Sequence, residues 1–164
     1  MTQAAIAIGE GEFAPERLAA ANINPRTGLA TDYLNHFNEV VMLLEMLPDM
    51  PDCAEDVLAW EPLDYVGHFE RSSFAERGLA IAAYAAAPKA VRAHLETIVC
   101  SLNEEIAEAQ CMLRAGAPDA CTKAAAKAES DIKPLIADAS GAIHGRIDGE
   151  DFGEGQAEID ALFG

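Results

Sequence analysis

The sequence is poor in aromatic residues and in positive charge, and it has no long apolar run. Aromatic side chains make up 6% of its 164 residues, and 28 acidic residues against 11 Lys and Arg give a net charge of −17 at pH 7. This charge would repel a nucleic-acid backbone or an anionic membrane surface, so we expect neither as a partner. The richest apolar run, Val40–Leu47, is interrupted by Glu45 and ended by Pro48, well short of the roughly 18 residues of a membrane span.

Paired cysteines and a charged leader are also missing. The four cysteines, at positions 53, 100, 111 and 121, form no Cys-x-x-Cys pair. Their spacing matches neither a zinc module nor a disulfide framework. No Lys or Arg precedes the first short apolar run, unlike the start of a secretory signal. We therefore expect reduced cysteines, a cytoplasmic location and no cofactor.

Alanine is abundant, and this favours helices. There are 33 alanines among the 164 residues, a composition that suits close-packed helices better than sheets. Apolar residues at helical spacing predict helices over 15–22, 29–47, 52–60, 74–86, 88–114 and 119–143. The sequence therefore predicts an all-α helix bundle, with about three main helices plus short helices. We expect Pro134 to kink the last helix, because proline removes one helical hydrogen bond.

The chain changes character after this helical region. Residues 144–155, HGRIDGEDFGEG, contain four glycines and four acids without an apolar period, which is typical of a flexible, acidic linker. Residues 156–164 are patterned again, with Ile159, Leu162 and Phe163 at helical spacing. We therefore divide the chain into a helical bundle domain over 1–143, a linker and an amphipathic partner-binding peptide. Docking of this peptide on its own bundle remains the alternative.

Residues 156–164, QAEIDALFG, resemble the CheY-binding peptide of the flagellar switch protein FliM, which reads roughly Ser-Gln-x-Glu-Ile-Asp-x-Leu-Leu. The matching residues are Gln156, Glu158, Ile159, Asp160, Ala161 and Leu162. Phe163 stands where a second leucine is usual, and Gly155 replaces the serine. The layout of helices, linker and peptide is also similar to that of the chemotaxis phosphatase CheZ. The resemblance implies a CheY-like receiver as partner, and a homodimer through the long helices.

A polar face is predicted near the start of the first long helix. Asp32, Asn35, His36 and Glu39 are spaced i, i+3, i+4 and i+7, and so share one helix face. Hydrolysis of a phosphoaspartate needs an amide to hold water and an acid to engage the receiver's lysine. Asp32-x-x-Asn35 resembles the Glu-x-x-Asn pattern of one receiver phosphatase family, with a shorter acid. We therefore take Asp32 and Asn35 as catalytic candidates, and His36 and Glu39 as secondary ones.

Two other interpretations of this face remain open. It is equally typical of a solvated helix surface on a non-catalytic scaffold, with His36 bonded to Asp32 or Glu39. A metal-binding, ferritin-like bundle is the second, because helical bundles assemble metal sites from carboxylates and imidazoles on facing helices. Three histidines are each followed by a nearby glutamate, in the pairs His36–Glu39, His68–Glu70 and His94–Glu96. The order is the reverse of the usual Glu-x-x-His.

Overall fold

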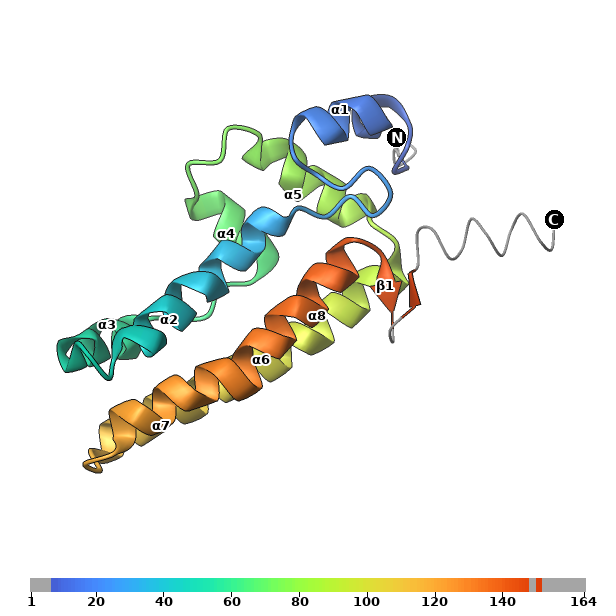
Figure 1. Ribbon diagram of the computed structural model, residues 1–164. Coiled ribbons are helices and arrows are strands. Elements are labelled where there is room, and N and C mark those ends of the chain that lie inside the picture. Colours follow the sequence, from blue (N-terminus) through green and yellow to red (C-terminus); the bar gives the residue numbers. More distant parts are fainter. Residues whose placement is uncertain (1–6, 148–149, 152–164) are drawn as a thin grey trace. The chain divides into compact units, whose positions relative to one another are not determined.

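The computed structural model describes residues 7–147 and 150–151, and its regular structure is overwhelmingly helical (Figure 1). The all-α prediction is confirmed. The described residues belong to two compact units, each built from separate stretches of chain. Of these residues, the first unit holds 7–33, 64–96, 140–147 and 150–151, and the second holds Leu34–Leu63 and Thr97–Ala139.

The first unit contains short helices and the ends of two long ones. Its elements are η1 (Gly11–Phe13), α1 (Pro15–Ala20), most of η2 (Thr31–Leu34), α4 (Tyr65–Arg71), α5 (Arg77–Ala86), the start of α6 (Lys89–Ala115) and the end of α8 (Lys133–Ile143). Pro15 opens α1, where its missing N–H has no helical partner to lose. Asp64 begins α4, because its carboxylate accepts the backbone N–H of Gly67 at 2.7 Å. The fully buried core includes Leu18, Ile23, Leu29, Phe69, Ala80, Ala83, Val91 and Ile143.

A turn around Asn24 follows α1 in this unit. The side-chain oxygen of Asn24 accepts the backbone N–H of Thr27 at 3.1 Å, which closes the turn locally. Gly28 has a φ of 78°, and a Cβ there would lie 2.5 Å from Cδ1 of Ile8. The buried hydroxyl of Thr27 donates to the carbonyl of Ile143 at 2.6 Å. The turn is thereby joined to the end of α8.

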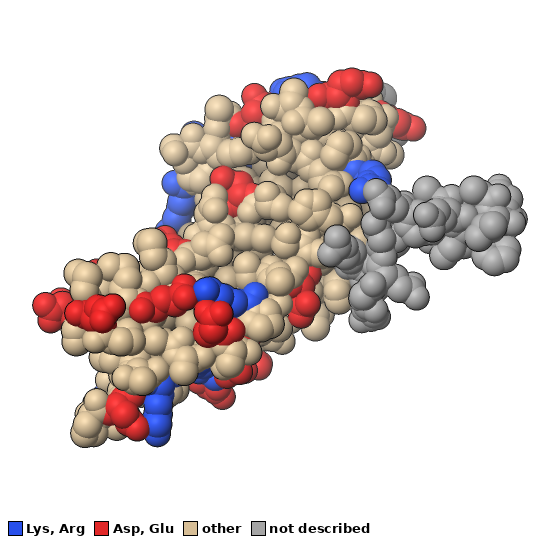
Figure 2. All heavy atoms as spheres, in the orientation of Figure 1, with Lys and Arg blue, Asp and Glu red and all other residues tan. Residues whose placement is uncertain are grey.

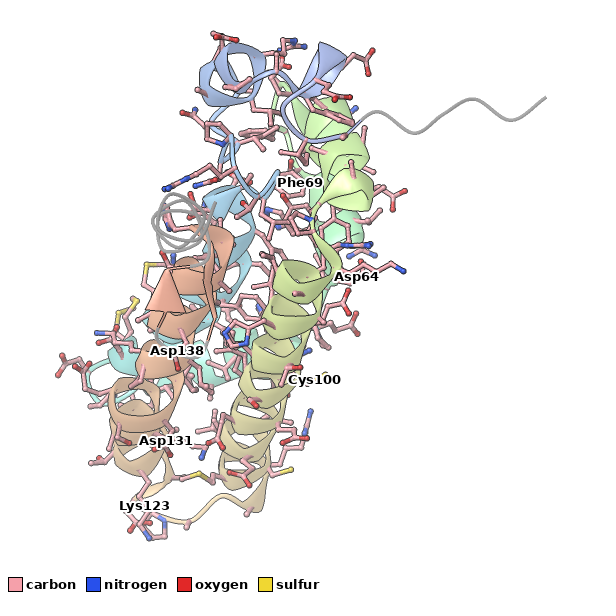
Figure 3. The ribbon with its side chains drawn as sticks, turned by 90° about the vertical axis from the view of Figure 1, so that its right-hand side faces the viewer. Asp64, Phe69, Cys100, Lys123, Asp131 and Asp138 are labelled. Atoms are coloured by element: carbon pink, nitrogen blue, oxygen red, sulfur yellow. The ribbon has the colours of Figure 1, made fainter. Side chains whose placement is uncertain are left out.

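The second unit is built around two long helical segments that run antiparallel (Figures 1 and 3). One is α6 from Thr97 onward; the other is a continuous rod of α7 (Ala120–Lys127), η4 (Ala128–Ile132) and the start of α8. The helix α2 (Asn35–Met46) packs against α7 and η4, and also against α3 (Ala54–Ala59), which follows η3 (Pro51–Cys53). Its fully buried side chains include Phe37, Val40, Leu44, Val57, Leu102, Ile106, Ala109, Ala124 and Ile132. The apolar stripes predicted on these helices therefore form its core.

A lysine surrounded by carboxylates joins α6 to the rod. The ammonium of Lys127 lies within salt-bridge distance of Glu105, 2.8 Å from Glu108 and 3.2 Å from Asp131. Its side chain is only 12% exposed. The three carboxylates raise the pKa of Lys127 against the opposing effect of burial. We call these four residues the Lys127 cluster; Asp131 lies in η4, on the rod beside α6 (Figure 3).

The rod widens immediately before Pro134. Residues Ala128–Ile132 form a π-helical turn, and α8 starts at Lys133. Proline cannot donate to the carbonyl four residues earlier and its ring crowds that carbonyl, so a wider turn relieves both problems. The disturbance predicted at Pro134 is therefore present as a π turn.

The predicted start of the first long helix, at residue 29, is wrong. Leu29 and Ala30 are not helical, Thr31–Leu34 form a 3₁₀ turn, and α2 begins only at Asn35. The backbone N–H of Ala30 instead donates to the hydroxyl of Tyr65 at 2.8 Å. A tertiary partner therefore takes up this backbone group ahead of the helix. The helix expected from residue 74 likewise begins later, as α5 at Arg77.

The C-terminal region is described only in part. The helix α8 ends at Ile143, at the predicted domain boundary. Within the segment expected to be an irregular linker, the two-residue strands β1 (Arg146–Ile147) and β2 (Glu150–Asp151) pair antiparallel. Residues 148–149 and 152–155, together with the peptide 156–164, lie outside the described residues. In the described part of the chain, no helix combines the length and apolarity needed to cross a membrane.

Candidate functional site

The four residues predicted to share a polar face have different environments. Asn35 and Glu39 are exposed on α2, whereas His36 is buried with 7% of its surface accessible. Asp32 lies in the 3₁₀ turn before α2 and is half-buried. Asp32 also belongs to the first unit, whereas the other three belong to the second. The single helix face is therefore a wrong prediction, because α2 starts after Asp32 and turns His36 toward its buried side.

Asp32 is paired with a histidine distant in the sequence. Its Oδ2 lies 2.9 Å from Nε2 of His68 on α4, with the two side chains 29% and 12% exposed. The ring of Tyr33 meets His68 edge-on, with centroids 5.6 Å apart. The imidazole and this aromatic contact hold the carboxylate in place. The acid proposed to engage a receiver's lysine therefore already has a partner within its own unit.

The tyrosines of the first unit form an aromatic cluster. The rings of Tyr65 and Tyr84 stack with centroids 4.4 Å apart, and Tyr33 meets Tyr65 edge-on at 5.3 Å. Burial is the largest cause that raises the pKa of all three hydroxyls. The hydroxyl of Tyr84 also donates to Glu96 at 2.6 Å. Protonated, packed phenols of this kind serve as core and hydrogen-bonding groups rather than as bases or nucleophiles.

In the second unit, His36 fixes the chain that leads out of α3. Its imidazole stacks on Trp60, with ring centroids 4.5 Å apart, and its backbone carbonyl accepts the indole N–H at 3.0 Å. The backbone N–H of Leu63 donates to Nε2 of His36 at 3.0 Å. The amide of Gln110 on α6 donates to the carbonyls of Val57 and Trp60, at 2.9 and 3.0 Å. The Nε2 lone pair is thereby used in folding, which removes His36 from the candidates for metal binding.

Replacement of His36 by phenylalanine tests this structural role. His36→Phe keeps an aromatic ring against Trp60 but leaves the Leu63 N–H without its acceptor. We expect the free energy of unfolding to fall by about 1–2 kcal/mol in urea titrations. Asn35→Ala, at the exposed neighbouring position, should change it by less than about 0.5 kcal/mol. Equal stability of the His36→Phe variant and the original chain would show that the Leu63 bond contributes nothing.

Sequence reasoning missed two features of these units. The first is His68 as the partner of Asp32, which lies 36 positions away and leaves no local pattern. The second is the exposure of Met42 and Met50, which are 56% and 52% accessible. The regular four-residue spacing of Met42, Met46 and Met50 is a sequence signal that could have revealed the second feature.

Metal-ligating residues do not gather in the described ranges. Among residues 7–147 and 150–151, no group of three or more His, Cys, Asp or Glu side chains is arranged to hold a metal ion. His68 is instead bonded to Asp32, and Glu96 to Tyr84. The cysteines are unpaired thiols; Cys53 is buried, whereas Cys100 and Cys111 are exposed on α6.

The residues predicted to bind a partner lie outside the described part of the chain. These are Gln156, Glu158, Ile159, Asp160, Leu162 and Phe163. Their role therefore rests on the sequence pattern. Comparisons with protein-family models, with curated proteins and with solved structures found no match to this chain.

Proposed function

We propose that this chain is an adaptor of bacterial two-component signalling that captures a CheY-like receiver through residues 156–164. The observation that carries the proposal is the run Gln156 to Leu162, which matches the receiver-binding peptide pattern at all five of the positions that the pattern specifies there. Ile159, Leu162 and Phe163 would form one apolar edge if the peptide became helical. Such an edge is suited to lie in a groove on the receiver, with the acidic residues at its border.

The described residues support an adaptor more than an enzyme. Two of the four polar side chains that sequence reasoning marked as chemical are committed to folding, His36 to Leu63 and Asp32 to His68. The aromatic groups pack against each other within their units. A helical scaffold that presents a binding peptide does not need catalytic residues. Dimerisation through the long helices remains a prediction.

A peptide titration tests the proposal. A fluorescein-labelled peptide of residues 153–164 is titrated with CheY-like receivers, with and without beryllium fluoride as a mimic of the phosphoryl group. We expect saturable binding that is tighter for the receivers in the phosphorylated form. A matched peptide with alanine at positions 159, 162 and 163 should not bind. Equal binding of both peptides, or of neither, would refute receiver capture.

Catalysis is the second part of this proposal, and the exposure of Asn35 on the first turn of α2 favours it. Positioning a water for attack can lower the activation free energy of a hydrolysis by several kcal/mol. Asn35→Ala should therefore slow receiver dephosphorylation by at least about a hundredfold, measured as phosphate release from the phosphorylated receiver. Asn38→Ala, also exposed on α2, is the matched control and should leave the rate unchanged. If Asn35→Ala and Asn38→Ala gave the same rate of phosphate release, catalysis would be refuted and the adaptor function would be the part of the proposal that stands.

A further inference from the structure

Three methionines line the exposed side of α2 and the turn that follows it. Met42, Met46 and Met50 are spaced by four residues, and the N–H of Met50 bonds to the carbonyl of Met46 at 2.8 Å. The four-residue spacing therefore continues for one turn beyond the end of α2. Met42 and Met50 are the exposed large apolar side chains among the described residues, and Met46 is half-buried.

Exposed methionines in a row are typical of surfaces that bind other proteins. Their side chains are unbranched and polarisable, so they adapt to apolar partners of different shape. Exposed large apolar side chains are unfavourable in water when they gather in one place, and such patches mark interaction sites. The core face of α2 is a different one, with Phe37, Val40 and Leu44 fully buried, whereas Leu43 is half-buried. The methionine row is therefore distinct from the core face of the same helix.

The stretch of chain that holds this row carries negative charge and no Lys or Arg. Residues 34–63 contain seven acids and no Lys or Arg. Glu39, Asp49 and Asp52 are exposed beside the row, whereas Glu45 is engaged by Lys133 from α8 at 2.8 Å. Figure 2 shows acidic side chains gathered over the part of the second unit formed by α2 and α3. An apolar row bordered by carboxylates is complementary to a partner with apolar and positive groups on neighbouring faces.

We propose that this methionine face, defined as Met42, Met46 and Met50 with Glu39, Asp49 and Asp52, binds a basic amphipathic helix of another protein. The helical part of the row rises about 6 Å from Met42 to the end of α2 at Met46, and the turn over residues 47–49 then leads to Met50. A partner with apolar residues at i, i+3 or i+4 and i+7 would cover the methionines. Its Lys and Arg residues would then lie against the carboxylates.

Other occupants fit this surface poorly. The peptide 156–164 contains Glu158 and Asp160 and no basic residue, so its charge has the wrong sign. A second copy of residues 34–63 would bring seven further acids and no Lys or Arg. The proposed site is therefore separate from receiver capture by residues 156–164, and it does not depend on that function.

Methionine methyl NMR tests the proposal directly. The full chain is labelled with ¹³C at its methionine methyl groups and titrated with an 18-residue model helix of leucine and lysine, whose leucines lie on one face. We expect the signals of Met42, Met46 and Met50 to move, and those of Met1 and Met112 to stay. A scrambled peptide of equal composition, without an apolar face, should bind at least about tenfold more weakly. No binding, or shifts that spare the three methionines, would overturn the proposal.

Two sets of variants separate this site from attraction to the net charge. Neutralising Glu39, Asp49 and Asp52 as Glu39→Gln, Asp49→Asn and Asp52→Asn should weaken model-helix binding by about tenfold or more. The matched set Glu10→Gln, Glu12→Gln and Glu16→Gln makes the same change in charge at exposed positions of the first unit, and should weaken it much less. The double variant Met42→Gln, Met50→Gln should also weaken binding of the model helix by about tenfold, and its circular dichroism spectrum should be unchanged. Equal losses from the two charge sets would overturn the proposal in favour of non-specific attraction.

Discussion

Removal of residues 156–164 is expected to weaken binding of a phosphorylated receiver by at least about a hundredfold, while thermal unfolding stays nearly unchanged. The binding loss follows because the apolar anchors Ile159, Leu162 and Phe163 are removed together, and each well-packed anchor contributes on the order of 1–2 kcal/mol. Stability should persist because the buried apolar side chains of the described residues run from Phe13 to Ile143. Calorimetric titration and differential scanning calorimetry on the full and shortened chains measure both quantities.

The control for this deletion replaces only the anchors. A full-length chain with Ile159→Ala, Leu162→Ala and Phe163→Ala should lose receiver binding to the same extent as the deletion. A fall of many degrees in the melting temperature of either chain would instead place these residues in the folded core. Retained binding by the shortened chain would refute the assignment of receiver capture to this peptide.

Replacement of Lys127 by methionine is expected to cause the largest loss of stability. Lys127→Met keeps an unbranched apolar stem but leaves Glu105, Glu108 and Asp131 without their cation. Breaking a buried ion pair typically costs about 3–5 kcal/mol, and we expect the lower end, about 3 kcal/mol, because Lys127 and Glu105 are largely covered whereas Glu108 and Asp131 are exposed. For a chain of this length the melting temperature should fall by roughly 6–12 °C.

A second lysine on the same rod provides the matched control. Lys123 pairs with Asp119 at 3.2 Å, but the two side chains are 64% and 55% exposed. Exposed pairs contribute at most about 1 kcal/mol, so Lys123→Met should have little effect. If the two variants were equally stable, the Lys127 cluster would be no more than a surface ion pair.

The difference between the original chain and Lys127→Met should also depend on pH. The hydrogen bond from Lys127 lowers the pKa of Asp131 below its usual value of 3.8. A carboxylate with a lowered pKa in the folded state stabilises it above the unfolded pKa, and this contribution disappears as the pH falls through the folded pKa. The raised pKa of Lys127 keeps its charge constant at and below neutral pH. The stability difference should therefore hold near neutral pH and shrink below about pH 4.

The long helices could be predicted from sequence because their signal is local. The range 88–114 was expected from apolar spacing, and α6 spans Lys89–Ala115. Its apolar side chains Leu102, Ile106 and Ala109 are fully buried. Repeated apolar spacing over many turns leaves few alternatives for such a segment.

The candidate site was predictable only in part, because its geometry depends on residues distant in the chain. Spacing alone placed His36 beside Asp32 on a polar face. In the structure, His36 lies on the buried side of α2. It is held there by hydrogen bonds with Trp60 and Leu63, which are 24 and 27 positions away in the sequence. Asp32 is held by His68, 36 positions away. A periodic pattern records which face of a helix is apolar, but it does not record which polar side chain finds a buried partner.

The π turn at Ala128–Ile132 also has a consequence for changes in chain length. Each residue of an α-helix advances the side-chain direction by about 100°, whereas a π turn accommodates one extra residue without that advance. Ala124 before this turn and Ala139 after it are both fully buried. Deleting one residue within this turn would restore uniform winding and keep both alanines in phase with the core, whereas a deletion elsewhere between them would rotate one of them by about 100°. The expected cost of a single deletion within Ala128–Ile132 is therefore the crowding of Pro134 in an uninterrupted α-helix and not a loss of core register.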